Sequence, residues 1–231
     1  RGLKPVHWSP SSQTALAEAE LEYPSGHVSK SIYVGFKVNQ IPKTLAQEIS
    51  EQAPDLFDSE GKLKEIRLLI WTTTPWTIPA NEAISVNQKL DYVIAQSSDR
   101  SLIILANDLL EEVSKVVGIS YEKRVLIKGS RLDGVIYTHP LFDKKSPVVL
   151  GGDYITTESG TGLVHTAPGH GVDDFNTGSK YNLPITCPVD ERGFLTKEAG
   201  QFEGLNVLKD ANNIIINLSL IHISEPTRLS A

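Results

Sequence analysis

The sequence lacks several features that would assign it to particular classes of protein. It has no methionine and one cysteine, Cys187, among 231 residues. A single thiol can form neither an internal disulfide nor a cysteine cage for zinc. A complete natural chain begins with methionine unless it has been processed, so we expect a fragment of a longer protein. No apolar run approaches the roughly 20 residues that cross a bilayer, and residues 1–5 lack the apolar segment of a secretory signal. We therefore expect no membrane partner.

Positive charge is also in short supply. The chain has 22 Lys and Arg against 28 Asp and Glu, for a net charge of −6. A general nucleic-acid binder is usually basic, so that class is disfavoured, although a local patch could still hold one end of an RNA. The densest basic group is Lys123, Arg124, Lys128 and Arg131. These side chains could equally be a solvated strand edge, where lysines discourage edge pairing.

What remains is an ordinary composition, 40% hydrophobic and 22% charged, with more strand signals than helix signals. Apolar alternation and β-branched runs predict strands, and residues 154–156 are a weaker strand candidate after Gly151 and Gly152. Helix propensity is high at 14–22, although this short segment could be a connector, and a cap at Asn107 or Asp108 with a closing Gly118 favours a helix over 109–117. We predict a β-rich α+β fold in which a barrel-like mixed sheet carries a few short peripheral helices. The main strands are expected at 31–38, 66–72, 92–96, 102–106, 123–128, 133–137, 148–150 and 163–166, and the helices at 44–52, 109–117, 172–180 and 207–218.

The first unusual motif is WTTTPWTIPAN, residues 71–81. It follows a predicted strand, and its two prolines forbid a regular ladder and stiffen the loop. Buried hydroxyls must find partners, so this loop could receive ribose hydroxyls or a carbonyl oxygen. The alternative is an ordinary threonine-rich strand surface followed by an asparagine in a turn. The candidate ligand contacts are Trp71, Thr72, Thr73, Thr74, Thr77 and Asn81.

The second motif is GTGLVHTAPGHGVDDF, residues 160–175. Two histidines and two aspartates could hold a metal, but no common zinc spacing is present. His165 follows apolar residues and is expected in a cavity floor, whereas His170 between glycines could simply be exposed. Asp173 or Asp174, in the first turn of a helix, could pair with a ligand ammonium.

Nucleophilic catalysis by a side chain has little support in the sequence. There is no G-x-S-x-G elbow, and Cys187 sits in apolar company that suits a buried, inert thiol. If the domain hydrolyses an ester, a water positioned by the protein is the expected nucleophile.

Both motifs, together with KPVHWSPSSQTALAEAELEY, NLPITCPVDERGFLT and FEGLNVLKDAN, closely resemble the isoleucyl-tRNA synthetase family of bacterial or organellar type, over about residues 1–218. The related valyl and leucyl enzymes tend to carry an arginine in the threonine loop and AHD in place of residues 168–171. The resemblance lies in the editing domain, an insertion between the halves of the Rossmann catalytic domain. The ATP-binding motifs of that catalytic domain, HIGH and KMSKS, do not occur in these residues, so the fragment should not activate amino acids.

The resemblance implies post-transfer editing, the hydrolysis of mischarged Val-tRNA(Ile) by a positioned water. It places Thr72, Thr73 and Thr74 around the terminal adenosine and the ester, and Asp174 on the α-amino group. The implied substrate-binding residues are Trp71, Thr77, Asn81, Gly162, His165, Ala167 and, as a weaker candidate, Asp173. His165 would contribute to the side-chain sieve, the part of the pocket that selects the amino acid by the size of its side chain.

The same resemblance implies no cofactor or metal for editing, with ATP and Mg²⁺ needed by the full-length enzyme alone. The expected partners are the acceptor 3′ end of tRNA(Ile), valine and the parent's Rossmann domain, in a monomer. The compartment would be the cytoplasm of a bacterium, or a plastid or mitochondrion. Two rival functions stay open, a non-catalytic insertion that binds the tRNA acceptor end and a metal-dependent hydrolase.

We predict four segments along the chain. Residues 1–22 connect to the catalytic core, 23–205 form the editing domain, and 206–218 form a returning helix. Residues 219–231 depart in character and are expected to be non-native, from cloning or translational read-through.

Overall fold

The computed structural model describes residues 5–22 and 30–219. Nine described strands form one mixed sheet, in the order β11-β5-β10-β9-β3-β4-β7-β6-β8. The pairs β4/β7 and β5/β10 are parallel, and the other neighbours are antiparallel. The strands are β3 (Ile32–Gln40), β4 (Ile66–Thr72), β5 (Ala83–Val86), β6 (Asp91–Ser97), β7 (Leu102–Ala106), β8 (Tyr121–Lys128), β9 (Ile136–Thr138), β10 (Lys145–Leu150) and β11 (Leu163–Thr166).

The sheet is strongly curved, but the described strands do not close it into a barrel. The edge strand β11 packs against β4, which is five places away in the strand order. No backbone ladder joins these two described strands, and β8 forms the other edge. The predicted α+β class is therefore confirmed, while the barrel-like sheet is corrected to an open one. The curvature matters because it brings the ends of β4 and β11 together.

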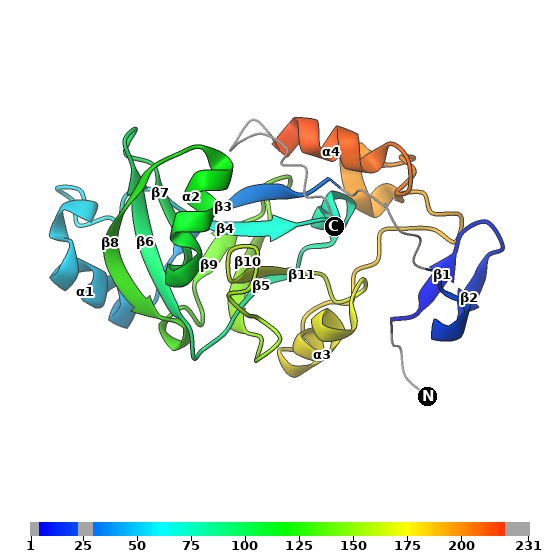
Figure 1. Cartoon of the computed structure of the whole chain (residues 1–231), viewed down its shortest axis with the longest axis horizontal. Helices are drawn as coiled ribbons and strands as arrows, with labels where there is room; N and C mark the ends of the chain where they lie inside the picture. The colour runs from blue at the N-terminus through cyan, green and yellow to red at the C-terminus, as the bar shows by residue number, and fades with distance from the viewer. Residues whose placement is uncertain (1–4, 23–29, 220–231) are drawn as a thin grey trace.

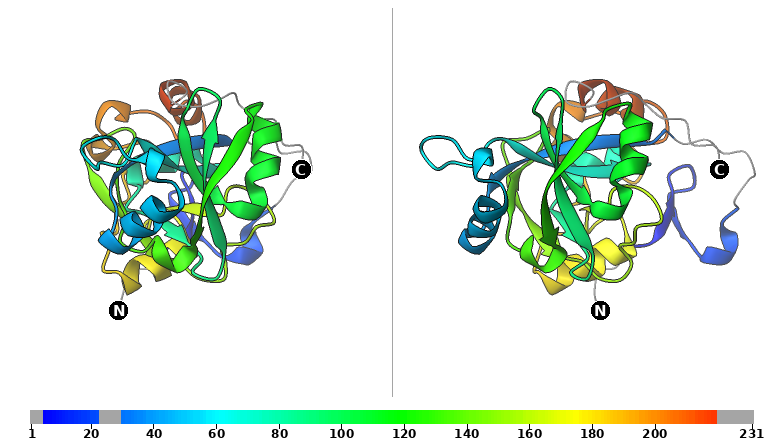
Figure 2. Two further views of the ribbon diagram at one scale, coloured as in Figure 1. Left: turned by 90° about the vertical axis from the view of Figure 1, so that its left-hand side faces the viewer. Right: turned by 60° about the vertical axis from the view of Figure 1, so that its left-hand side comes forward.

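Four α-helices lie around the sheet in the described part of the chain, α1 (Lys43–Gln52), α2 (Leu110–Val117), α3 (Val172–Lys180) and α4 (Ala211–Ser219). In Figures 1 and 2, α1 and α2 flank the end of the sheet that carries β6–β8, and α3 and α4 lie on opposite sides of its other end. Helix α2 buries Leu110 and Val113 and ends at Gly118, which adopts the left-handed conformation that glycine accepts at low cost. Among the described residues, no helix is long and apolar enough to span a membrane.

Local signals differed from the structure in three places. The segment 14–22, whose propensity favoured a helix, contains β2 (Thr14–Leu16), which pairs with β1 (His7–Ser9) in a separate hairpin. That hairpin lies away from the main sheet (Figure 1) and is anchored by the Trp8 indole, which donates to the Glu191 carbonyl at 2.8 Å. Residues 154–156, predicted as a strand, form no strand. The returning helix begins at Ala211 rather than at 207, and residues 220–231 of the predicted tail lie outside the described residues.

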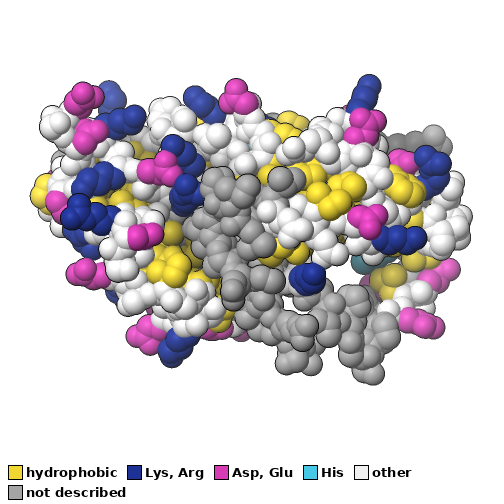
Figure 3. All heavy atoms as spheres, turned by 90° about the horizontal axis from the view of Figure 1, so that it is seen from above, with side chains coloured by type: hydrophobic (Ala, Val, Ile, Leu, Met, Phe, Trp, Pro, Cys, Tyr) yellow, Lys and Arg dark blue, Asp and Glu magenta, His cyan; other side chains and the backbone are white. Residues whose placement is uncertain are grey.

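Each member of the basic group, which lies on and just after the edge strand β8, contacts a neighbouring polar or acidic side chain. Arg124 pairs with Asp55 at 2.7 Å, Lys128 with Asp91 at 2.8 Å, and Arg131 with Glu48 at 2.8 Å. Lys123 donates to the side chain of Asn107 at 2.8 Å. Charged side chains of both signs are interspersed on the face seen in Figure 3. These contacts favour a solvated strand edge, and a contact with RNA there stays an untested prediction.

Candidate functional site

The threonine loop begins where β4 ends, and its prolines give it a definite shape. Pro75 opens a 3₁₀ helix, Pro75–Ala80, at the first helical position, where its missing N–H costs nothing. The Thr74 amide donates to the hydroxyl of the buried Thr72 at 3.1 Å, which folds the loop back on the strand. Helix α4 secures the other side, because the side chain of Asn212 accepts a hydrogen bond from the Trp76 amide at 3.0 Å.

The histidine motif reaches the same place through β5, a strand that the sequence did not reveal. Strand β11 pairs antiparallel with β5 and sets His165 opposite Ile84. The ladder continues as the Glu82 amide donates to the Thr166 carbonyl at 3.0 Å. Because β5 follows the threonine loop directly, this pairing places His165 beside that loop.

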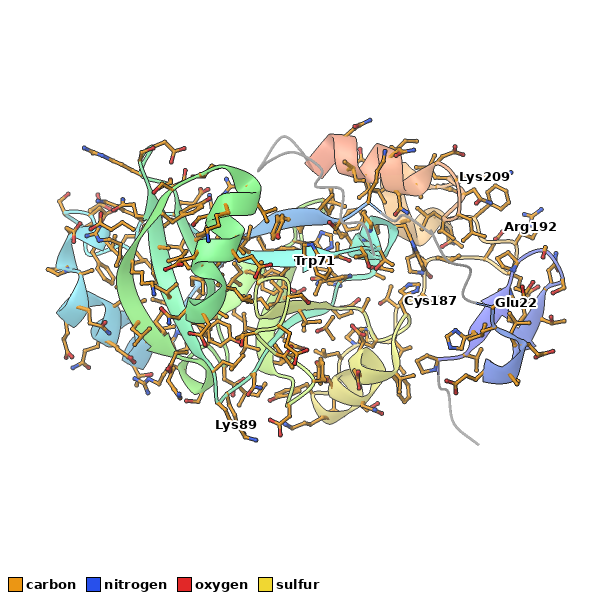
Figure 4. All side chains as sticks on the ribbon, in the orientation of Figure 1. Glu22, Trp71, Lys89, Cys187, Arg192 and Lys209 are labelled. Atoms are coloured by element: carbon orange, nitrogen blue, oxygen red, sulfur yellow. The ribbon has the colours of Figure 1, made fainter. Side chains whose placement is uncertain are left out.

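A cavity of about 290 Å³ lies between the two motifs. Figure 4 shows Trp71, which lines it, near the centre of the molecule at the end of β4. Thr72 and Thr77 are buried in its wall, whereas Thr73 and Thr74 are exposed at its rim. The structure thus brings together eight of the eleven predicted site residues. The full lining is Trp71, Thr72, Thr73, Thr74, Thr77, Val164, His165, Ala167, His170 and Asp174.

Asp174 supplies the cavity's carboxylate from the first turn of α3. One carboxylate oxygen accepts a hydrogen bond from the Ala167 amide at 2.8 Å. The other lies so close to Gly171 that a Cβ there would approach within 2.1 Å, so the glycine makes room for the carboxylate. Burial raises the pKa of Asp174 above its ordinary value. A partly desolvated carboxylate of this kind gains strongly from an opposite charge.

His165 is buried and both of its ring nitrogens have protein partners. Nδ1 lies 2.8 Å from the side-chain nitrogen of Asn81, and Nε2 lies 3.0 Å from the Thr77 hydroxyl. Burial, with smaller contributions from His139 and His170, lowers the pKa of His165 to about 3. His165 is therefore neutral at physiological pH, and it offers the cavity a rigid wall rather than a free acid or base.

His170 is a cavity residue whose placement the sequence left open. Its ring lies edge-on to Trp76, with the ring centroids 5.1 Å apart. Burial lowers its pKa to about 4, and its Nε2 is buried without a hydrogen-bonding partner among the described residues. The flanking glycines suggested exposure, and nothing in the local sequence signalled that Trp76 would cover the ring.

Three predicted site residues do not line this cavity. Asn81 is completely buried behind it and contacts His165. Asp173 is exposed on α3 and points its charge to solvent. Gly162 lines a neighbouring cavity of about 150 Å³. Cys187, expected to be buried, is exposed.

Gly162 has a packing role that its motif did not disclose. It adopts φ +73°, and a Cβ would lie 2.4 Å from the Ala106 Cβ. We expect Gly162→Ala to lower the free energy of unfolding by about 2–5 kcal/mol, the sum of left-handed strain and overpacking. Gly134→Ala is the matched control, because Gly134 has φ +78° with nothing within 4 Å, so strain alone should cost about 1–2 kcal/mol. Urea unfolding of both variants measures the difference, and equal losses would contradict the close contact.

Among the described residues, no group of three or more His, Cys, Asp or Glu side chains is arranged to hold a metal ion.

Residues 56–218 match the family model described as the editing domain of leucyl-tRNA synthetase. The chain belongs to this family of editing domains. Its sequence corresponds to the editing domain of isoleucine–tRNA ligases, which are class I aminoacyl-tRNA synthetases. It is 87% identical over 217 residues to the isoleucine–tRNA ligase of Prochlorococcus marinus strain NATL2A and 57% identical over 217 residues to that of Synechococcus sp. strain CC9311. Each alignment covers 94% of the chain and 22% of the relative, so the chain spans under a quarter of these proteins.

Solved structures of editing domains share the fold. The editing domain of the P. knowlesi cytosolic leucyl-tRNA synthetase aligns with a TM-score of 0.66 at 13% identity, over 90% of this chain and 100% of that one. The corresponding P. falciparum domain aligns with a TM-score of 0.59 at 15% identity, over 82% and 97%. At this low identity the likeness supports the editing-domain fold alone.

Proposed function

We propose that the chain hydrolyses the ester that joins valine to tRNA(Ile). The observation that carries the proposal is that the Asp174 carboxylate and the Thr72–Thr74 segment line one cavity. A mischarged tRNA end carries a free ammonium beside an ester and a ribose. Asp174 would pair with the ammonium, while the exposed Thr73 and Thr74 would seat the terminal adenosine.

The arrangement favours water as the nucleophile. His165 is an unsuitable base, since burial lowers its pKa to about 3 and both its ring nitrogens have protein partners. The cavity's remaining polar groups are mainly hydroxyls and backbone, which can orient a water and stabilise the developing oxyanion by hydrogen bonds. Catalysis would therefore come from positioning rather than from a covalent intermediate.

A small editing cavity answers a known limit of recognition. One methylene is worth only about 1–3 kcal/mol in a hydrophobic pocket, and isoleucyl-tRNA synthetase is the established example. A synthetic site that accepts isoleucine cannot strongly exclude valine, so a second cavity that excludes isoleucine improves fidelity. The buried His165 and Thr77 would form the wall that does so.

The wider setting is proposed from the family. We propose that residues 5–22 and 206–218 connect this domain to a Rossmann catalytic body, which would use ATP and Mg²⁺ for aminoacylation. The relatives from Prochlorococcus and Synechococcus favour the bacterial type and hence the cytoplasm. The partner would be the acceptor end of tRNA(Ile), bound by a monomer without a metal or cofactor for editing.

The direct test is deacylation of Val-tRNA(Ile) by the 231-residue chain, followed as release of labelled valine. We expect faster release than from Ile-tRNA(Ile), with no change after treatment with EDTA. Binding of the tRNA end without turnover would instead support a non-catalytic insertion. Loss of activity with EDTA and recovery with zinc would support a metal-dependent hydrolase.

A further inference from the structure

Asn81 is held too firmly to be a ligand-binding side chain. It is fully buried and lies outside the cavity lining. Its side-chain oxygen accepts a hydrogen bond from the Tyr137 hydroxyl. Its side-chain nitrogen lies 2.9 Å from the Ala83 carbonyl oxygen and 2.8 Å from Nδ1 of His165.

The backbone of Asn81 is fixed as well. Lys144 donates to the Asn81 carbonyl at 3.0 Å and forms an ion pair with Glu82 at 2.6 Å. Glu82 in turn accepts a hydrogen bond from the Thr186 hydroxyl at 2.6 Å. Neither the main chain nor the amide can therefore turn toward the cavity without breaking several buried contacts.

These partners determine the direction of each hydrogen bond. A carbonyl accepts and cannot donate, so the group facing Ala83 must be the NH₂ of Asn81. The second hydrogen of that NH₂ points to His165, so Nδ1 of His165 must accept it. A neutral imidazole that accepts at Nδ1 carries its proton on Nε2.

The direction continues into the threonine loop. Nε2–H of His165 donates to the Thr77 hydroxyl, which donates its own proton to the Thr74 carbonyl at 2.9 Å. That carbonyl also accepts the Thr77 amide at 3.0 Å and opens the 3₁₀ helix beside the cavity rim. The protonation state of one buried ring is thus coupled to the shape of the loop that lines the cavity.

We propose that Asn81 is a positioning residue that holds His165 as its Nε2–H tautomer, and through it orders Thr77 and the Thr74 carbonyl. Asn81 acts through His165 and does not touch the substrate. The proposal refines the editing site. Only its kinetic test, deacylation, rests on the proposed function, because the His165 tautomer can be observed without any substrate.

The test is the ¹H–¹⁵N correlation spectrum of the histidine side chains, in which the two tautomers give different nitrogen shifts. The His165 signals are assigned with a His165→Gln variant. We expect the Nε2–H form in the unmodified chain. In Asn81→Asp a carboxylate faces Nδ1, so His165 should change to the Nδ1–H form. Tyr137→Phe is the matched control, since it removes another hydrogen bond of Asn81 but keeps both NH₂ contacts, and it should retain the Nε2–H form.

Deacylation kinetics supply the second readout. We expect Asn81→Asp to lower kcat at least tenfold with KM changed less than threefold. An Nδ1–H tautomer in the unmodified chain would overturn the proposal, and this holds even if Asn81→Asp fails to fold. An Asn81→Asp variant that keeps the Nε2–H form would overturn it too. If no variant shows deacylation, the proposed function fails while the tautomer result still decides this inference.

Discussion

Replacing Asp174 with asparagine is expected to reduce deacylation of Val-tRNA(Ile) about 100-fold while the chain stays folded. Asparagine keeps the oxygen that accepts the Ala167 amide at 2.8 Å, but it removes the negative charge that we assign to the substrate ammonium. A hydrogen bond to a charged group is worth about 1.5–3 kcal/mol, and about 1.4 kcal/mol corresponds to a factor of ten in rate. Single-turnover release of valine measures the effect.

The control for this variant is Asp173→Asn, which changes the neighbouring charge exposed to solvent. It should retain activity within about threefold, equivalent to well under 1 kcal/mol. If Asp173→Asn loses activity while Asp174→Asn keeps near-normal turnover, our account has assigned the substrate ammonium to the wrong carboxylate.

The Asp174→Asn variant should also change how the free energy of unfolding depends on pH. Burial raises the folded-state pKa of Asp174 above its ordinary value, so folding favours its protonated form. That contribution is fully present below the unfolded-state pKa and is lost as pH rises through the folded-state pKa. At neutral pH the buried, ionised carboxylate therefore lowers the free energy of unfolding. Asparagine carries no charge, so Asp174→Asn should be at least as stable as the unmodified chain. Urea unfolding at neutral and acidic pH measures this, and a large loss of stability at neutral pH would contradict it.

Replacing His165 with alanine is expected to enlarge the cavity and weaken its discrimination against isoleucine. His165 fills a buried wall of the cavity, and its removal makes room for the additional methylene. Since one methylene is worth about 1–3 kcal/mol of discrimination in this family, the preference for valyl over isoleucyl esters should fall by about tenfold or more. The measurement is the ratio of kcat/KM for the two esters.

This variant also leaves the Asn81 amide and the Thr77 hydroxyl without their His165 partner. Each unpaired buried group costs about 1–3 kcal/mol, so His165→Ala should be assayed well below its melting temperature. An unchanged ratio in a folded variant would remove His165 from the sieve.

Local signals predicted the elements that carry the two motifs. The bounds of β4, β11 and α3 agree with the predicted ranges 66–72, 163–166 and 172–180. Two of them have a strong local cause, an apolar run that ends at prolines for β4 and a glycine followed by aspartates for α3. Asp174 and the threonine loop also line one cavity, and the roles predicted for them there stay predictions.

Contacts between distant segments could not be predicted in the same way. The strand β5 is four residues long and owes its place to partners at 148–150 and 163–166. The place of Asn81 behind the cavity depends on Tyr137, 56 residues away. Gly162 resembled a ligand-binding glycine, but its close contact is with Ala106, which no local pattern could indicate.

The central claim is that one carboxylate in this cavity binds the amino group of the substrate. Its most direct test compares the affinity of a non-hydrolysable valyl-adenosine analogue with that of the same molecule lacking the amino group. We predict that the amino compound binds the unmodified chain at least about tenfold more tightly, or about 1.4 kcal/mol, and that this advantage disappears in Asp174→Asn. Equal affinities for the unmodified chain would contradict the account.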